Sequence, residues 1–145
     1  MRRRIIAAGA AIIVGAIGFA TWPTQESNVA LTSDTVTAGS ALANVIVPET
    51  LSSNAQIGKV AFEAACVSCH GENAAGQNGV APPLVHIIYE PNHHGDESFQ
   101  RAAALGVRAH HWPFGNMPPV EEVTRADVAM IVAYVRELQR ANGIN

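Results

Sequence analysis

The chain has few cysteines and no sign of β-structure. Of its 145 residues, only Cys66 and Cys69 are cysteines. Two thiols are too few for a structural zinc site, which takes four ligands, and no histidine pair at zinc-finger spacing completes a set. No segment repeats, and no stretch alternates as a half-buried strand does. Any core must therefore be built from helices.

Basic residues are also scarce beyond the start of the chain. Three of the nine are Arg2, Arg3 and Arg4, and past them six basic residues face twelve acidic ones, a net charge of −6. This acidity would repel nucleic-acid phosphates, so we expect no nucleic-acid partner. The charge either favours a basic docking surface on a partner or serves solubility.

Residues 5–22 carry no charge and end before Pro23. As a helix this run would rise about 27 Å, slightly short of a hydrocarbon core of about 30 Å, with Trp22 at the interface. A cleaved signal peptide is the alternative, because Gly18 and Ala20 are small residues at positions that a signal peptidase reads. Both interpretations export the remainder to the periplasmic side, tethered to the cytoplasmic membrane if the run is uncleaved and soluble otherwise.

Composition divides the chain into three parts. Residues 1–22 are the membrane anchor or signal segment, residues 23–52 a flexible linker, and residues 53–145 the folded domain. Such a linker spans about 30 Å as a random coil. Its segment LANVIVPETL is apolar enough to pack somewhere, which weighs against complete disorder.

The domain is predicted to begin near Ser53, which would be the N-cap of a first helix that delivers Cys66 at its end. Its apolar residues recur at helical spacings: Ile57, Val60, Ala61 and Ala64. Six prolines follow before the last helix, so the middle should consist of short helices and loops, including a helix over 96–107.

The last helix is predicted to begin with TRAD, where Thr124 and Asp127 can form a capping box. One face carries the apolar residues Val128, Ile131, Val132, Val135 and Leu138. Arg136 and Arg140 lie near the C-terminal end, where the helix dipole favours cations, and Gly143 is a natural stop.

Cys66, Cys69 and His70 form a C-x-x-C-H motif. A thioredoxin-like redox pair would need a βαβ context, which is absent. Covalent haem attachment remains: each thiol can form a thioether with a haem vinyl group, and the adjacent imidazole can ligate the iron. The motif therefore predicts haem c.

With this motif, about residues 53–143 resemble the class I monohaem c-type cytochromes. Gly58 and Phe62, eight and four residues before Cys66, match small and aromatic positions of that family, and Tyr134 matches the aromatic of its last helix. The resemblance implies an all-α cytochrome c fold, with short helices around one covalently attached haem and crossing N- and C-terminal helices. A glycine at the crossing lets two backbones approach closely.

The resemblance also implies a second axial ligand. Met117 in FGNMPPV matches the family's methionine loop and is the predicted ligand. Met130 lies within the last helix, where core packing is the expected role. His110 and His111 are the competitors, and bis-histidine ligation would lower the reduction potential.

By the same resemblance, GVAPPLV lies on the His70 side of the haem. A carbonyl near Pro82 or Pro83 should accept a hydrogen bond from His70, and Leu84 should pack on the ring. Candidates for holding the haem propionates are Tyr89, Arg101, Arg108 and Trp112. The chain departs from family members that dock through a ring of lysines, because Lys59 is its only lysine.

Two histidine pairs, His93/His94 and His110/His111, accompany His86 in the middle of the domain. Clustered imidazoles suit copper or zinc, which makes a second metal site one hypothesis. The pattern alone favours the other, in which these histidines bond to water, carbonyls or haem carboxylates, because no spacing here specifies a coordination geometry.

The predicted function is a one-electron carrier that is not an enzyme. It would shuttle between redox protein partners, expected to be membrane-associated, with the N-terminal segment as a membrane contact. Two alternatives remain open: the haem subunit of a larger membrane-associated oxidoreductase, and a haem sensor with a displaceable axial ligand.

Overall fold

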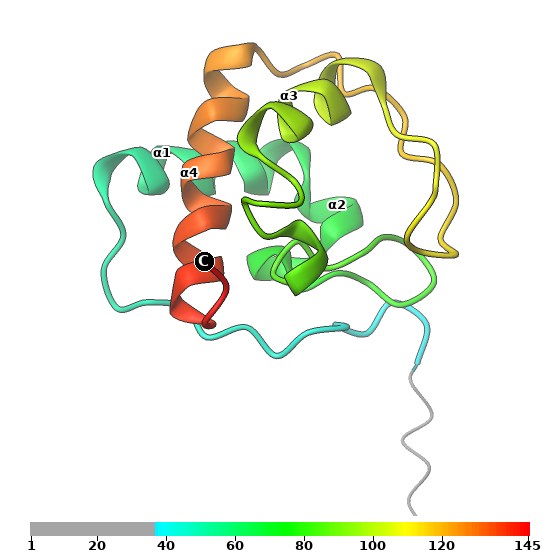
Figure 1. The fold of residues 1–145 in the computed structure, drawn as a ribbon, viewed down its shortest axis with the longest axis horizontal. Helices are drawn as coiled ribbons and strands as arrows, with labels where there is room; N and C mark the ends of the chain where they lie inside the picture. The colour runs from blue at the N-terminus through cyan, green and yellow to red at the C-terminus, as the bar shows by residue number, and fades with distance from the viewer. Residues whose placement is uncertain (1–36) are drawn as a thin grey trace, which may run out of the picture. The chain divides into compact units, whose positions relative to one another are not determined.

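The computed structural model describes residues 37–145, which form helices joined by loops with no β-strand in that range (Figure 1). The predicted all-α fold is confirmed. The α-helices are α1 (Ser53–Ala65), α2 (Val67–His70), α3 (Asp96–Leu105) and α4 (Arg125–Ala141). Two short 3-10 helices, η1 (Glu72–Ala74) and η2 (Ile87–Tyr89), lie between α2 and α3.

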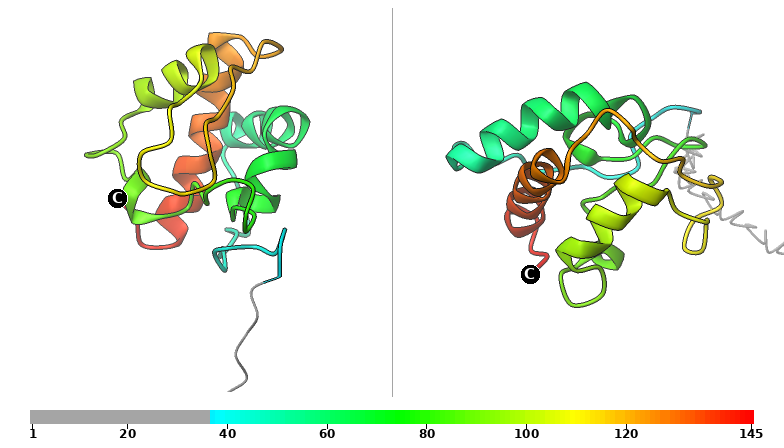
Figure 2. Two further views of the ribbon diagram at one scale, coloured as in Figure 1. Left: turned by 90° about the vertical axis from the view of Figure 1, so that its right-hand side faces the viewer. Right: turned by 90° about the horizontal axis from the view of Figure 1, so that it is seen from above.

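The first and last helices of the domain, α1 and α4, cross, as Figures 1 and 2 show from three directions. A Cβ on Gly58 would lie 1.8 Å from the carbonyl oxygen of Met130, so only glycine fits at the contact. Beside it, the Phe62 and Tyr134 rings pack with centroids 5.7 Å apart. The Tyr134 hydroxyl donates to Asn73 Oδ1 over 3.1 Å, which ties the crossing to the chain after α2. The predicted crossing of these helices is confirmed.

Both helices begin at side-chain caps. The predicted capping box of α4 is confirmed, because Thr124 Oγ1 accepts from the Asp127 amide and Asp127 Oδ2 accepts from the Thr124 amide. The N-cap of α1 is Ser52, one residue earlier than predicted, and its hydroxyl accepts from the Ala55 amide at 3.3 Å. Each cap satisfies an amide that would otherwise lack an intrahelical partner.

The buried face of α1 differs from the one that its larger aliphatic residues suggested. Ile57 and Val60 are 58% and 68% exposed, whereas Ala55, Gly58 and Phe62 are buried. Close approach of α4 requires small residues at the contact, so the aliphatic side chains lie on the outer face. On α4, by contrast, the five predicted apolar residues are all buried.

The chain before α1 packs against the domain. The amides of Leu42 and its neighbour donate to the Ala75 carbonyl at 3.1 and 2.9 Å. The Ile46 backbone forms two hydrogen bonds with the Asn142 side-chain amide, at 2.9 and 2.8 Å. The prediction of a flexible linker over residues 23–52 is therefore wrong for its described part, because these bonds fix the backbone and apolar side chains of this segment pack against the core.

The predicted anchor or signal run, residues 5–22, lies outside the described residues. Within residues 37–145, no helix has both the length and the apolar character needed to span a bilayer.

Candidate functional site

A cavity of about 530 Å³ lies beside the crossing helices, within the range of ligand and cofactor sites. It is bordered by α2, the loop after η1, α3 and the loop between α3 and α4. Cys66, Cys69 and His70 line it together with Met117, which is far away in the sequence. The fold thus brings the C-x-x-C-H motif and the predicted methionine to one cavity.

The C-x-x-C-H motif forms a tight turn at the end of α1. Cys66 caps α1, and its carbonyl accepts from the His70 amide at 2.9 Å within the short helix α2. Gly71 then reverses the chain with a φ of 71°, where a Cβ would lie 2.7 Å from the Gly76 carbonyl oxygen. The Gly76 amide donates to the His70 carbonyl over 2.7 Å, which closes the loop that follows the motif.

The His70 imidazole is buried and oriented by a backbone carbonyl. Its Nδ1 lies 2.9 Å from the Pro82 carbonyl oxygen and donates to it as the Nδ1–H tautomer, which leaves the Nε2 lone pair available to a metal. Burial lowers the pKa of His70, and the bond to Pro82 opposes this effect. The imidazole is therefore neutral near pH 7, as metal ligation requires.

The two prolines of GVAPPLV have different positions. Pro82 and Leu84 line the cavity. Pro83 is fully buried behind the cavity, so it is not at the cavity surface, where a cofactor contact would lie. It packs against Gly76 instead: a Cβ on Gly76 would lie 2.4 Å from the Pro83 backbone nitrogen. Only Pro82 contacts His70 through its carbonyl.

The two cysteines are not joined in a disulfide. Cys66 is half-buried and Cys69 is exposed. Burial, followed by the charge of Cys69, raises the pKa of Cys66 to about 11. The thiols line one side of the cavity, from which each could be joined to a group bound there.

Met117 is fixed by its backbone on the opposite loop. Its amide and carbonyl exchange hydrogen bonds with Val107, both at 2.9 Å, in an isolated antiparallel bridge. Gly106 packs closely against the same backbone, because a Cβ on Gly106 would lie 2.5 Å from the Met117 carbonyl oxygen. Met130 does not line the cavity; it is half-buried, and its carbonyl lies at the α1–α4 contact.

All four candidates for propionate contacts line the cavity: Tyr89, Arg101, Arg108 and Trp112. The Trp112 indole Nε1 is buried without a hydrogen-bond partner among the described residues. An unpartnered buried N–H is costly unless an acceptor enters the site, so this donor fits a cofactor carboxylate. Burial raises the pKa of the Tyr89 hydroxyl, and a polar interaction with the Trp112 indole N–H, which lacks hydrogen-bond geometry, opposes the rise. The residues present therefore fit a haem c.

Two polar residues that support the site were not predicted as such. Arg136, expected near the helix end as a dipole partner, is buried instead and binds Asp96 at 3.0 Å and the Tyr89 carbonyl at 2.7 Å. Gln139 is fully buried, and its amide nitrogen donates to the carbonyls of Leu84 and Tyr89 at 2.8 and 3.0 Å. Their spacing of three, on the apolar face of α4, is the sequence signal that could have revealed them.

Three of the five clustered histidines also line the cavity: His94, His110 and His111. His93 and His86 do not, although the His86 ring packs edge-on against Trp112 with centroids 5.1 Å apart.

The family model described as cytochrome c matches residues 55–139, more than half of the chain, and no curated protein matches it. This family implies a covalently bound haem c with its iron, and haem-based electron transfer. The matched span contains the crossing helices, the C-x-x-C-H turn and Met117. On these grounds the chain belongs to the cytochrome c family.

Proposed function

We propose that this protein is an exported class I monohaem cytochrome c that carries one electron at a time, with His70 and Met117 as the axial ligands. The observation that carries the proposal is the convergence of the C-x-x-C-H turn and Met117 on one cavity. When bound there, the haem supplies an iron that cycles between the ferric and ferrous states.

Each protein residue then has a defined task. Cys66 and Cys69 would hold the cofactor by thioether links, and the Pro82 carbonyl keeps His70 in the tautomer with a free Nε2. The Val107 bridge restrains the backbone of Met117. With His70 and Met117 both engaged, the site would have no open position for a small molecule, and little rearrangement would accompany electron transfer, which suits a carrier. A thioether ligand also raises the reduction potential.

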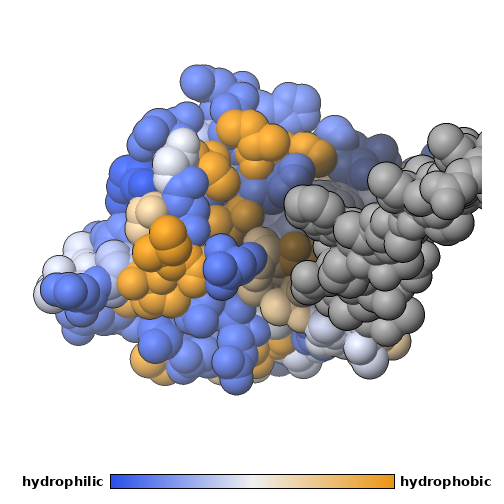
Figure 3. Space-filling model, turned by 90° about the horizontal axis from the view of Figure 1, so that it is seen from below, coloured by the Kyte–Doolittle hydropathy of each residue, from blue (hydrophilic) through white to orange (hydrophobic). Residues whose placement is uncertain are grey.

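The partners that we propose are membrane-associated redox proteins at the outer face of the cytoplasmic membrane. Arg2 to Arg4 before the uncharged run support this location, and retention of that run would raise the local concentration near such partners. Because the chain has a single lysine, it must contact a redox partner through other surface residues. Apolar residues interrupt the hydrophilic surface on the face shown in Figure 3, and Val80 and Leu105 are exposed residues that also line the cavity.

An optical spectrum of the haem-loaded protein, oxidised and reduced, tests the ligation. The wild type should show a Soret band and, in the ferric state, the weak red charge-transfer band of sulfur ligation. Met117→Ala should abolish that band and lower the potential, while Met130→Ala should keep it. Retention of the band in Met117→Ala would refute Met117 as the ligand.

Carbon monoxide separates a carrier from a sensor. The reduced wild type should resist carbon monoxide, and Met117→Ala should bind it readily because one axial position is then open. Rapid, tight binding by the wild type would favour a sensor. Co-purification of a second polypeptide in fixed stoichiometry would instead indicate the subunit of a larger oxidoreductase.

A further inference from the structure

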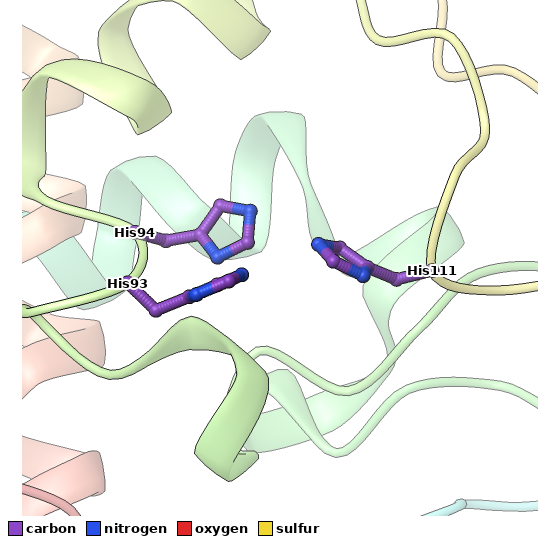
Figure 4. A group of neighbouring side chains, drawn as sticks. All are labelled: His93, His94 and His111. Carbon is purple, nitrogen blue, oxygen red and sulfur yellow. The ribbon is translucent and has the colours of Figure 1, made fainter.

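Histidines from two separate loops meet at the edge of the cavity. His93 and His94 lie between η2 and α3, and His111 lies on the loop before α4 and faces them in Figure 4. One ring nitrogen from each of the three lies within 4.8 Å of the other two. We propose that His93, His94 and His111 form a second metal site that binds a divalent copper or zinc ion.

The spacing of the imidazoles suits such an ion after small movements. Zinc–nitrogen bonds of about 2.0–2.1 Å place two ligands of a tetrahedral site about 3.4 Å apart. The nitrogens, within 4.8 Å of one another, must therefore approach by about 1.4 Å at most. His93 and His111 are exposed, so their rings can turn without disturbing the core. Rotation of these side chains can therefore bring the nitrogens to bonding distance without movement of the backbone.

The third imidazole is already held as metal ligands are. His94 Nδ1 lies 2.6 Å from the Ile88 carbonyl oxygen and donates to it, which leaves the lone pair on Nε2. A bond from the second ring nitrogen to a backbone carbonyl is the usual way in which proteins orient a ligating histidine. The backbone of this loop is also fixed, because Arg136 Nη2 donates to the His94 carbonyl at 2.5 Å.

Ligand type narrows the choice of ion. No cysteine belongs to this set, which favours Cu²⁺ and Zn²⁺ over ions that need thiolates, and copper should bind more tightly than zinc.

An ion at this place would cross-link two loops. One loop leads from η2 to α3, and the other carries Met117 six residues after His111. Metal binding should therefore restrain the segment of the predicted axial ligand. This consequence follows from the loop positions and requires only that His111 itself does not ligate the haem iron.

Metal titration of the haem-loaded full chain, without a polyhistidine tag, tests the proposal. We expect one Zn²⁺ per chain by calorimetry, and one Cu²⁺ with nitrogen couplings in its electron paramagnetic resonance spectrum. His93→Ala and His111→Ala should each weaken Zn²⁺ binding about 10-fold or more, as the loss of metal-site residues does. Absence of stoichiometric binding of either ion by the wild type would refute the site.

His110→Ala is the matched control. His110 neighbours His111 on the same exposed loop, with ring centroids 4.2 Å apart, yet its Nδ1 contacts the Arg108 carbonyl oxygen at 2.8 Å and it is outside the close set. It should keep Zn²⁺ affinity within about 3-fold of the wild type, well short of the loss expected for a ligand. Equal losses in His110→Ala and His111→Ala would refute the three-residue set.

Hydrogen exchange gives a readout independent of the haem iron. Saturating Zn²⁺ should slow amide exchange over residues 107–117 in the wild type and in His110→Ala, but not in His111→Ala. Tight binding without slower exchange in the wild type would refute the cross-link between the loops.

Discussion

The pair of crossing helices and the loop region around the cavity are built on different principles. In α1 and α4, contact depends on shape: a glycine, two rings and an aliphatic face leave no room for change. In the loops, position depends on single polar links, such as the Val107–Met117 bridge and the bond from His70 to Pro82. Packing therefore sets the frame, and a few hydrogen bonds place the ligands.

This difference predicts two kinds of mutational effect. Changes at the helix contact should reduce the free energy of unfolding of the whole domain. Changes at the loop links should loosen the ligands, with smaller effects on global stability. Substitutions in the two regions test this division.

The largest loss is expected for Gly58→Val. Its Cβ would lie 1.8 Å from the Met130 carbonyl oxygen, and a backbone atom cannot move aside as a side chain can. We expect a loss of about 3 kcal/mol or more in the free energy of unfolding, at the upper end for overpacking. Denaturant unfolding of the haem-loaded protein, followed by far-ultraviolet circular dichroism, measures it.

Gly95→Ala is the control from the loop region. Gly95 has a φ of −60°, and a Cβ there would lie 3.6 Å from the Pro91 carbonyl oxygen, an ordinary contact. The change should alter stability by about 1 kcal/mol at most. A similar loss in both variants would break the distinction between the two regions.

Arg136→Ala removes the main link between the regions. The guanidinium is buried and bonded to Asp96 and to the carbonyls of Tyr89 and His94. Leaving two carbonyls without this donor should cost about 2 kcal/mol, allowing for an Asp96 side chain that is 70% exposed. Thermal unfolding measures the loss, and hydrogen exchange should rise around residues 89–94.

Arg125→Ala is matched to this change. Arg125 also joins α4 to an acidic residue of α3, Glu97, at 3.0 Å, but its side chain is 73% exposed. Exposed ion pairs contribute little, so stability should stay near that of the wild type. If Arg125→Ala proved as damaging as Arg136→Ala, burial would not be what gives Arg136 its importance.

Thr124→Ala removes the two bonds of the Thr124 hydroxyl, which accepts from the Asp127 amide and donates to Asp127 Oδ2, and should cost about 1 kcal/mol. Ser52→Ala, which removes the single cap bond of α1, should cost less. Denaturation midpoints of the two variants at pH 7 test the order. Equal losses would mean that the bond from the Thr124 hydroxyl to the Asp127 carboxylate contributes nothing.

The effect of Thr124→Ala should depend on pH. The Thr124 side chain, then its backbone amide, lower the pKa of Asp127 in the folded protein. A lowered folded pKa means that the unfolded state binds the proton more readily, so the contribution is present above the usual Asp pKa of about 3.9 and is lost as pH falls below it. The difference between wild type and Thr124→Ala should therefore shrink below about pH 4. A constant difference down to pH 2 would contradict this linkage.

The smallest global effect is expected for Asn142→Ala. This change removes both side-chain bonds to the Ile46 backbone. Amide exchange should accelerate over residues 42–51 with little change in the unfolding midpoint. Asn116→Ala is the loop-region counterpart, since Asn116 Oδ1 accepts from the Ala109 amide at 2.9 Å, and it should leave residues 42–51 protected. Unchanged exchange in Asn142→Ala would show that other contacts hold this segment.

The helical frame could be predicted from the sequence because its signals are local. Thr124 with Asp127 marks a helix start, and the period of the apolar residues in α4 identifies its buried face. Cys66, Cys69 and His70 are adjacent in the chain, so their chemistry is also readable without a fold.

The rest depends on contacts between distant residues. Nothing local shows that Asn142 would bind the Ile46 backbone, so the segment before α1 resembled a free linker. The buried face of α1 was predicted wrongly from Ile57 and Val60 for a related reason. The close approach of two backbones, and not hydrophobicity, determines which face of α1 meets α4. The sequence likewise could not show that the ring nitrogens of the histidine cluster lie close together, because they come from two separate loops.

The buried amide of Gln139 has a consequence for the order of assembly. It joins the backbones of Leu84 and Tyr89, which precede it by 55 and 50 residues. Leu84 and Tyr89 both line the cavity. This wall of the cavity is therefore completed only after α4 has formed and packed against it, so the last helix to be synthesised within the domain is also the one that closes the site.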